Sequence, residues 1–245
     1  MRNASVLVLA LCAVMGSTGC VCLFGGASSE CGCEGLGLGR GETVKSKAAV
    51  NPVSMASDAI TPDGKLDEPA WKNAPALTDF IRGSDRPEVK TRALLTYDKD
   101  NLYVAVVCEE PNTDKLVTKA TQRDEDQVWS DDCVEIYVDP TNDKQGTSGY
   151  YGFFVTPKNV VYDRTDDGNW SSDAWKHGAN VVPGKGWVAE VAVPFKVMGV
   201  TPKAGHRLGL MVARIRKAGV SQYMTLVPCN NEAKDTTKYP VLELK

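Results

Sequence analysis

The chain has 245 residues, of which 42% are hydrophobic, and a formal net charge of −3. A chain so close to neutral, without a basic patch interleaved with aromatic residues, is not suited to bind the phosphate backbone, so we expect no nucleic-acid partner. After the N-terminal apolar run, no segment has the ~20 consecutive apolar residues that a membrane-spanning helix needs.

The first residues carry the features of an export signal. Arg2 precedes the apolar run ASVLVLALCAVMG at 4–16, which is too short to cross a bilayer. Small residues then lead directly to Cys20, so residues 1–19 are predicted to be a signal peptide. The segment resembles the signal of bacterial lipoproteins, in which this cysteine is acylated. We therefore expect an exported cell-envelope lipoprotein, in the periplasm or at the outer-membrane surface, that meets the membrane only through its lipid.

Residues 20–56 have the composition of a tether. They are rich in Gly and Ser and show no apolar periodicity, as is typical of a flexible linker. The cysteines at 22, 31 and 33 are expected in disulfides or as further acylation sites, because their C-x-C step is closer than the usual ligand spacing of structural zinc sites.

Residues 57–245 read as one domain built from short strands. A length of about 190 residues is enough for a single domain with a core of its own. Short β-rich runs alternate with turns rich in Asp, Asn, Gly and Pro, and no βαβ spacing appears, which predicts an all-β antiparallel β-sandwich of the jelly-roll kind. Strands are expected at 92–97, 102–109, 133–138, 150–156, 159–163, 187–193, 207–216, 222–227 and 241–244, and short helical turns at 69–74 and 195–198.

The stretch QVWSDDCVEIYVD at 127–139 combines a strand pattern with aromatic and acidic residues. Neighbours in a strand point to opposite faces, so Val134, Ile136 and Val138 are predicted to face the core. The acidic residues alternate with them and are predicted to line the outer face and the entrance of the strand. A tryptophan beside carboxylates suits a pyranose, whose C–H face stacks on the ring while its hydroxyls bond to oxygens. Alternatively, Trp129 covers the end of the core.

Five segments in order resemble the family 9 carbohydrate-binding modules. They extend over nearly the whole domain, and none is decisive alone. They are DGKLDEPAWKNA (63–74), YDKDNLYVAVVCEEP (97–111), VWSDDCVEIYVDP (128–140), GWVAEVAVPF (186–195) and GHRLGLMVARIR (205–216).

The resemblance implies a β-sandwich with structural calcium and a site for the ends of glycans. Such modules accompany glycoside hydrolases and cleave nothing themselves. It therefore implies a polysaccharide or oligosaccharide ligand and glycoside hydrolase partners. Its sugar site holds a ring between two tryptophans; Trp129 matches one of them, and Asp132 and Glu135 match acidic positions.

The sequence departs from this pattern where the second tryptophan is due. The stretch CNNEAKDTTKYP has none, and Ala233 lies near the expected place. The family also has a polar pair on the strand after the third segment, and this sequence has Phe154 and Thr156 there. Trp170 and Trp175, in the loop DRTDDGNWSSDAWKHG, are the candidates for a replacement ring.

Calcium prefers clustered oxygens from Asp, Asn and backbone carbonyls, so Asp139, Asn142 and Asp143 in DPTNDKQG are the candidate ligands. Acidic residues also cluster at 63–67 and at 163–167.

Three readings compete with a sugar-binding module. One is a structural or protein-interaction β-sandwich that has lost sugar binding. The missing second tryptophan favours this interpretation. Another is a haem-binding sandwich, for which no pair of axial ligands stands out. The third is an independent hydrolase, but the sequence shows neither a serine elbow nor a defined pair of glycosidase carboxylates.

Overall fold

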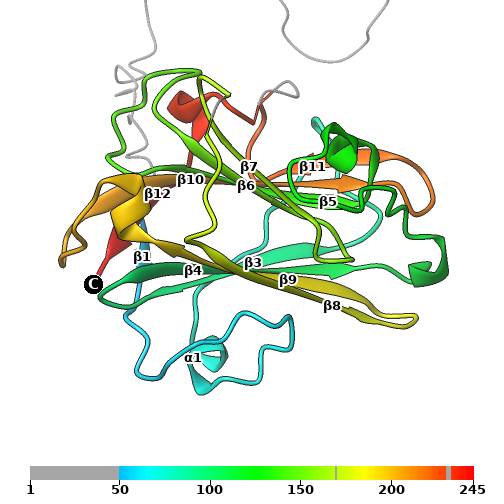
Figure 1. Ribbon diagram of the computed structural model, residues 1–245, viewed down its shortest axis with the longest axis horizontal. Coiled ribbons are helices and arrows are strands. Elements are labelled where there is room, and N and C mark those ends of the chain that lie inside the picture. Colours follow the sequence, from blue (N-terminus) through cyan, green and yellow to red (C-terminus); the bar gives the residue numbers. More distant parts are fainter. Residues whose placement is uncertain (1–49, 169, 230–232) are drawn as a thin grey trace, which may run out of the picture. The chain divides into compact units, whose positions relative to one another are not determined.

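The computed structural model describes residues 50–168, 170–229 and 233–245, which form two stacked β-sheets (Figure 1). This confirms the predicted β-sandwich. The first sheet has seven strands, in the order β1 (Val50–Val53), β12 (Val241–Leu244), β10 (Arg207–Arg216), β5 (Cys133–Asp139), β6 (Tyr151–Val155) and β7 (Val161–Thr165), with β11 (Gln222–Thr225) also paired to β10. The second has five, in the order β2 (Ala76–Leu77), β3 (Thr91–Tyr97), β4 (Asn101–Glu109), β9 (Gly186–Pro194) and β8 (Lys176–Val182).

Helices are short in the described part of the chain. The α-helix α1 spans Pro69–Lys72, and four 3-10 turns are η1 (Thr113–Lys115), η2 (Asp126–Ser130), η3 (Phe195–Met198) and η4 (Thr236–Lys238). None of the helices in these residues has the length and apolar character that a bilayer crossing requires. The turns at α1 and η3 agree with the two expected from the sequence.

The pairing differs from a purely antiparallel sandwich at one edge. Val50–Val53 lies within the range expected to be tether, and it pairs in parallel with β12, from Val50 opposite Val241 to Val53 opposite Leu244. All other ladders between named strands are antiparallel. The strand therefore adds a parallel edge to the seven-stranded sheet.

The interior of the sandwich is apolar and follows the predicted alternation. Val134, Ile136 and Val138 are fully buried, and Trp187 on β9 lies with them in the main core cluster. Burying side chains of this size contributes about 1.5–3 kcal/mol each. The described cysteines, Cys108, Cys133 and Cys229, are buried free thiols.

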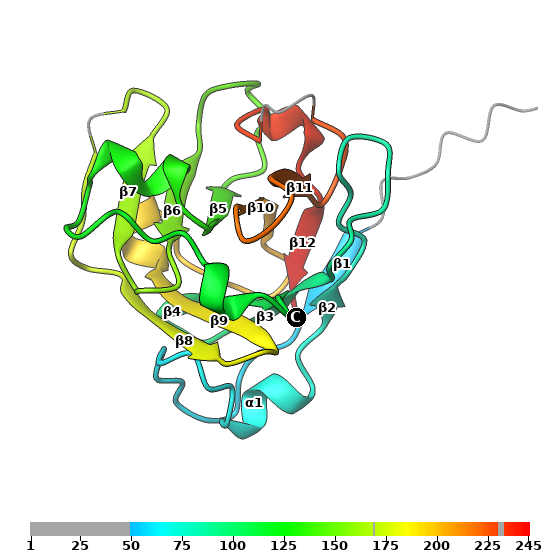
Figure 2. The same cartoon turned by 90° about the vertical axis from the view of Figure 1, so that its right-hand side faces the viewer.

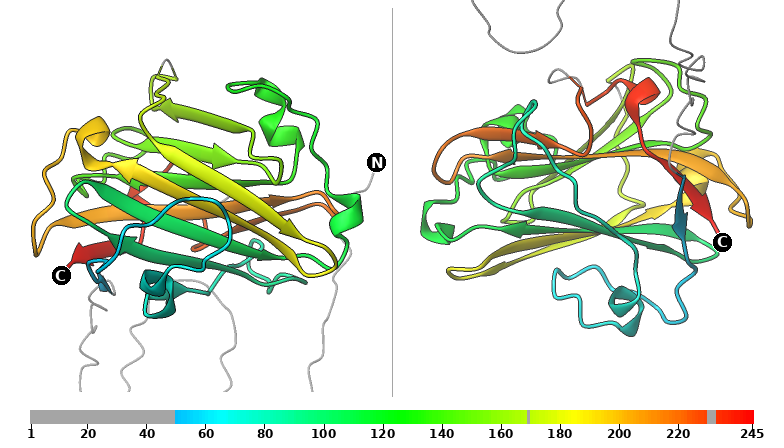
Figure 3. Two further views of the ribbon diagram at one scale, coloured as in Figure 1. Left: turned by 60° about the horizontal axis from the view of Figure 1, so that its bottom comes forward. Right: turned by 180° about the vertical axis from the view of Figure 1, so that it is seen from behind.

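A second apolar cluster covers the outer face of the five-stranded sheet. The segment between β1 and α1 runs across this face (Figure 3). The helix α1 lies on the same side of the five-stranded sheet (Figure 2). Trp71 and Ile60 pack there against Leu94 and Tyr103. Glu190 on β9 is fully buried and accepts from the backbone N–H groups of residues 63 and 64, which fixes the segment to the sheet.

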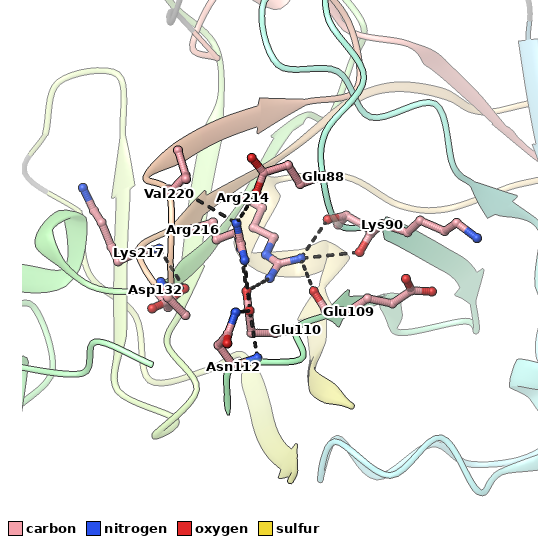
Figure 4. A network of polar contacts seen from close by, with 12 residues as sticks. Glu88, Lys90, Glu109, Glu110, Asn112, Asp132, Arg214, Arg216, Lys217 and Val220 are labelled. Atoms are coloured by element: carbon pink, nitrogen blue, oxygen red, sulfur yellow. Dashed lines mark hydrogen bonds and ion pairs between the residues drawn. The ribbon is translucent and has the colours of Figure 1, made fainter. Parts of the chain in front are cut away.

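A buried ionic network joins the two sheets at one end (Figure 4). Arg214 on β10 is fully buried and reaches across the sandwich to Thr91 Oγ1 at 3.2 Å and to the carbonyl of Glu109 at 3.1 Å. Glu110, also fully buried, accepts from Arg214 at 3.4 Å and from Arg216 Nε at 2.6 Å. Burial alone would raise the pKa of Glu110, but the two arginines and a backbone N–H hold that pKa below its ordinary value.

Candidate functional site

A pocket of ≈ 470 Å³ opens on the outer face of the seven-stranded sheet. Directly paired residues of neighbouring strands project to the same side of a sheet. Arg214, paired with Val134, points into the sandwich, so Glu135 and its partner Phe154 project outward. The segments of η2 and η4 lie over this outer side (Figure 1). The described lining residues are Trp129, Glu135, Tyr137, Thr147, Tyr223, Ala233 and Lys234.

The Glu135 carboxylate lies among tyrosine hydroxyls on this outer face. Its Oε2 atom accepts from Tyr223 Oη at 2.8 Å and from Tyr137 Oη at 3.1 Å. Burial raises the pKa of Glu135, and the two hydroxyl donors oppose that shift by stabilising the charged form. One carboxylate oxygen is thus held by the protein, and the other, Oε1, is the acceptor that remains for a ligand.

Trp129 forms a wall of the pocket at the end of η2. Its ring is partly buried and packs edge-on against Phe154, with centroids 5.9 Å apart, and tilted against Tyr162 at 4.7 Å. These contacts fix the ring on two sides. It therefore belongs both to the edge of the core and to the pocket, so the two interpretations of the sequence are compatible.

Ala233 and Lys234 line the pocket together with Trp129. Ala233 is buried, and it offers a methyl group near the place where the resemblance led us to expect a tryptophan. Lys234 is partly buried; burial, together with the nearby Arg164, lowers the pKa of its ammonium group, while Glu135 opposes the shift. A single indole ring therefore lines the pocket, which also carries one cationic side chain among its described lining residues.

Asp132 holds backbone segments together. Its carboxylate is fully buried and accepts from the backbone N–H groups of Val117, Lys217 and Ala218 at 2.8, 2.9 and 3.4 Å. These bonds tie the start of β5 to the end of β10 and to the segment after η1. Glu135 lies on the predicted outer face and Asp132 at the entrance of the strand, but other residues cover both: Asp132 is 0% exposed and Glu135 only 3%.

Trp170 and Trp175 lie on the other side of β6 from Trp129. Trp129 contacts Phe154, whereas Trp170 and Trp175 contact Phe153, whose side chain points the opposite way, at centroid distances of 5.9 and 5.1 Å. Trp175 is also buried, and its Nε1 donates to Asp163 at 2.9 Å. Neither ring can close over a ligand stacked on Trp129, so the structure does not bring the five predicted sugar contacts together.

The candidate calcium ligands form a turn after β5. Both oxygens of the buried Asp139 carboxylate are occupied, accepting from the backbone N–H of Asp143 at 3.3 Å and of Lys144 at 3.0 Å. The Lys144 ammonium is held nearby by the Tyr239 carbonyl. Asn142 Oδ1 is buried without a hydrogen-bond partner, and no group of three or more His, Cys, Asp or Glu side chains that could hold a metal ion occurs in the described residues. The Asp139 carboxylate is thus engaged by the backbone of its own turn, and a calcium ion held by Asp139, Asn142 and Asp143 stays a prediction.

Sequence reasoning missed four pocket residues. Tyr137 shares with Glu135 the outward-facing alternation of β5, which could have indicated it. Tyr223 lies in a predicted strand, and its position opposite Ile215 places it on the same face as Glu135, but this register is not visible before β10 and β11 are paired. Thr147 and Lys234 come from irregular segments, for which no periodic signal exists.

Known proteins match this chain in sequence. Endo-1,4-beta-xylanase A of Thermotoga neapolitana and that of Thermotoga maritima are each 25% identical to it over 190 residues. The matched region is 74% of this chain but only 17% and 16% of the two xylanases, so the chain corresponds to a small part of them.

Solved structures match the fold. Two structures of a carbohydrate binding module of family 9 from Caldicellulosiruptor kristjanssonii, with cellotriose and with glucose, give TM-scores of 0.63 and 0.62 at 16% and 15% identity. Each match covers 80% of this chain, and 94% and 96% of the respective module. The family model described as carbohydrate family 9 binding domain-like matches residues 62–245, and the chain therefore belongs to that family.

Proposed function

We propose that the domain binds the end of a polysaccharide or oligosaccharide in the pocket beside Trp129. The observation that carries this proposal is the placement of Trp129 and Glu135 in one pocket. A pyranose stacks its C–H face on such an indole ring and donates hydroxyl protons to a fixed carboxylate. Family membership supports the proposal, as do the modules of similar fold that were solved with cellotriose and glucose.

The biological setting belongs to the same proposal. The domain acts as a non-catalytic module that holds glycan for glycoside hydrolases, since the matched xylanases are far larger than the shared region. Export and acylation of Cys20 would keep it at the bacterial cell envelope. Cys20 lies outside the described residues, so labelling with a fatty-acid probe tests this part: wild type incorporates the probe, and Cys20→Ser does not.

The binding proposal is tested on a glycan panel with the full chain carrying Cys20→Ser. We expect Trp129→Ala to lower affinity about tenfold or more, because it removes the stacking surface. Trp170→Ala is the matched control, since it deletes an indole from the opposite face of the same sheet. Equal losses in the two variants, with both folded, would contradict the pocket assignment. A chelator arm tests calcium separately.

The second candidate is an interaction scaffold without sugar binding. Ala233, where a second ring is expected, is the observation that favours it. A folded protein that binds no member of the panel would move the assignment to this function.

A further inference from the structure

The polar groups of the pocket are unevenly available to a ligand. The hydroxyl protons of Tyr137 and Tyr223 are already committed to Glu135. The charged donor left among the described lining residues is the ammonium group of Lys234, with three N–H bonds. The pocket is therefore richest in donor capacity at Lys234, and a ligand is expected to bring a strong acceptor there.

Lys234 also forms no ion pair with another described residue. Glu135 is the acid of the same pocket, yet its Oε2 is engaged by the tyrosines rather than by Lys234. A partly buried ammonium group gains more from an anion than an exposed lysine does, because burial weakens the competition from water.

A second cation lies on the same face of the sheet. A Cβ atom added at Gly152 would lie 3.3 Å from both Arg164 Cγ and Tyr137 Cδ1, so the Arg164 side chain runs beside Tyr137. Arg164 and Lys234 repel each other electrostatically. A negative charge bound near Lys234 would relieve this repulsion.

On the basis of the proposed function, we infer that the pocket takes a glycan end that carries an anion, a uronic acid carboxylate or a sulfate ester, paired with Lys234. The sugar ring stacks on Trp129, and its hydroxyls face Glu135. The small Ala233 in place of a second ring leaves space beside the sugar for the charged substituent.

The experiment measures the affinity of the full chain by calorimetry for a neutral oligosaccharide, its uronate-ended analogue, the methyl ester of that uronate, and a sulfated analogue. We expect the anionic ligands to bind about tenfold more tightly than the neutral ones, a difference of ~1.4 kcal/mol. Lys234→Gln should abolish this preference, so that the anionic and the neutral ligands bind the variant with equal affinity. Lys238 is an exposed lysine on η4, and Lys238→Gln removes the same charge there. This control variant should keep the preference for anionic ligands. The uronate and sulfate arms identify the anion.

The outcomes separate the two proposals. Equal affinity for charged and neutral sugars in the wild type, or a preference that survives in Lys234→Gln, overturns the anion inference while sugar binding at Trp129 stands. If no sugar, charged or neutral, binds to the folded wild type, the proposed function fails and the anion inference fails with it.

Discussion

Glu135 illustrates what can be learned at the scale of a single residue. Strand alternation predicts the face on which it lies, and the structure confirms that face. Its burial could not be predicted, because Tyr223, which donates to it, lies 88 residues further along the chain, and Lys234, which lines the same pocket, lies 99 residues further. The hydroxyl groups that donate to this buried carboxylate also influence its pKa.

Tyr223→Phe tests that tuning. The variant removes a hydroxyl that stabilises the charged carboxylate, so the pKa of Glu135, already raised by burial, should rise further. Because the ligand needs the ionised form as an acceptor, glycan affinity in the variant should begin to fall at a higher pH on acidification than in the wild type. Titrations of affinity against pH check this. Tyr151→Phe, on the opposite face, should lose affinity at the same midpoint pH as the wild type. If Tyr223→Phe also lost affinity at the wild-type midpoint pH, the role of Glu135 would be contradicted.

The tryptophans show where residue-level prediction ends. Trp129 could be placed because it directly precedes a clear strand. Trp170 and Trp175 follow the strand pattern of β7 in an irregular loop, so the sequence does not reveal on which face of the sheet the loop folds. Their packing against Phe153 decides it.

At the scale of elements, nine of the strands follow from local patterns, and β1, β2 and β8 do not. The strand β8 reads KHGANVV, with glycine and polar residues and a half-buried pattern, because it is the edge of the five-stranded sheet. Gly178 is present for a tertiary reason: a Cβ there would lie 2.3 Å from the carbonyl oxygen of Pro62. No local pattern predicts this contact.

Gly178→Ala should therefore destabilise the domain by about 2–3 kcal/mol, because neither Pro62 nor the strand can move without breaking other contacts. The free energy of unfolding in urea measures the loss. Gly184→Ala is the control: its Cβ would meet nothing within 4 Å, and only its positive φ of 69° opposes the change. It should cost about 1 kcal/mol. Equal losses would contradict the close approach at Gly178.

At the scale of the whole domain, the sandwich could be predicted and the ionic link between its sheets could not. Arg214 and Arg216 alternate with apolar residues in β10 and look solvent-exposed from sequence alone. They are buried because Glu110, 104 residues earlier than Arg214, supplies the opposing charge inside the sandwich. The pairing depends on the stacking of the two sheets, which is a property of the complete fold.

Glu110→Gln should lower the free energy of unfolding at pH 7 by about 3–5 kcal/mol, because two buried guanidinium groups lose their counter-charge. The folded-state pKa of Glu110 lies below its unfolded value, so its ionic stabilisation is present above the unfolded pKa and is lost as the pH falls through the folded one. The difference from the wild type should therefore shrink in acid. Urea unfolding at a series of pH values measures it.

Glu88→Gln is the matched control in the same network. Its carboxylate accepts from Arg216 at 3.2 Å, but its side chain is 54% exposed. The loss should stay within about 1 kcal/mol. A Glu110→Gln loss as small as this, or one that does not change with pH, would contradict the assigned role of Glu110.

The parallel pairing of β1 with β12 has a mechanical consequence. The predicted tether enters the domain at Val50, and the four register pairs of this ladder receive any tension transmitted along it. A pull along the strand loads neighbouring hydrogen bonds together, in shear, instead of opening them one at a time. If the domain binds a glycan while its tether is anchored, the β1–β12 ladder would thus resist the force between the tether and the domain.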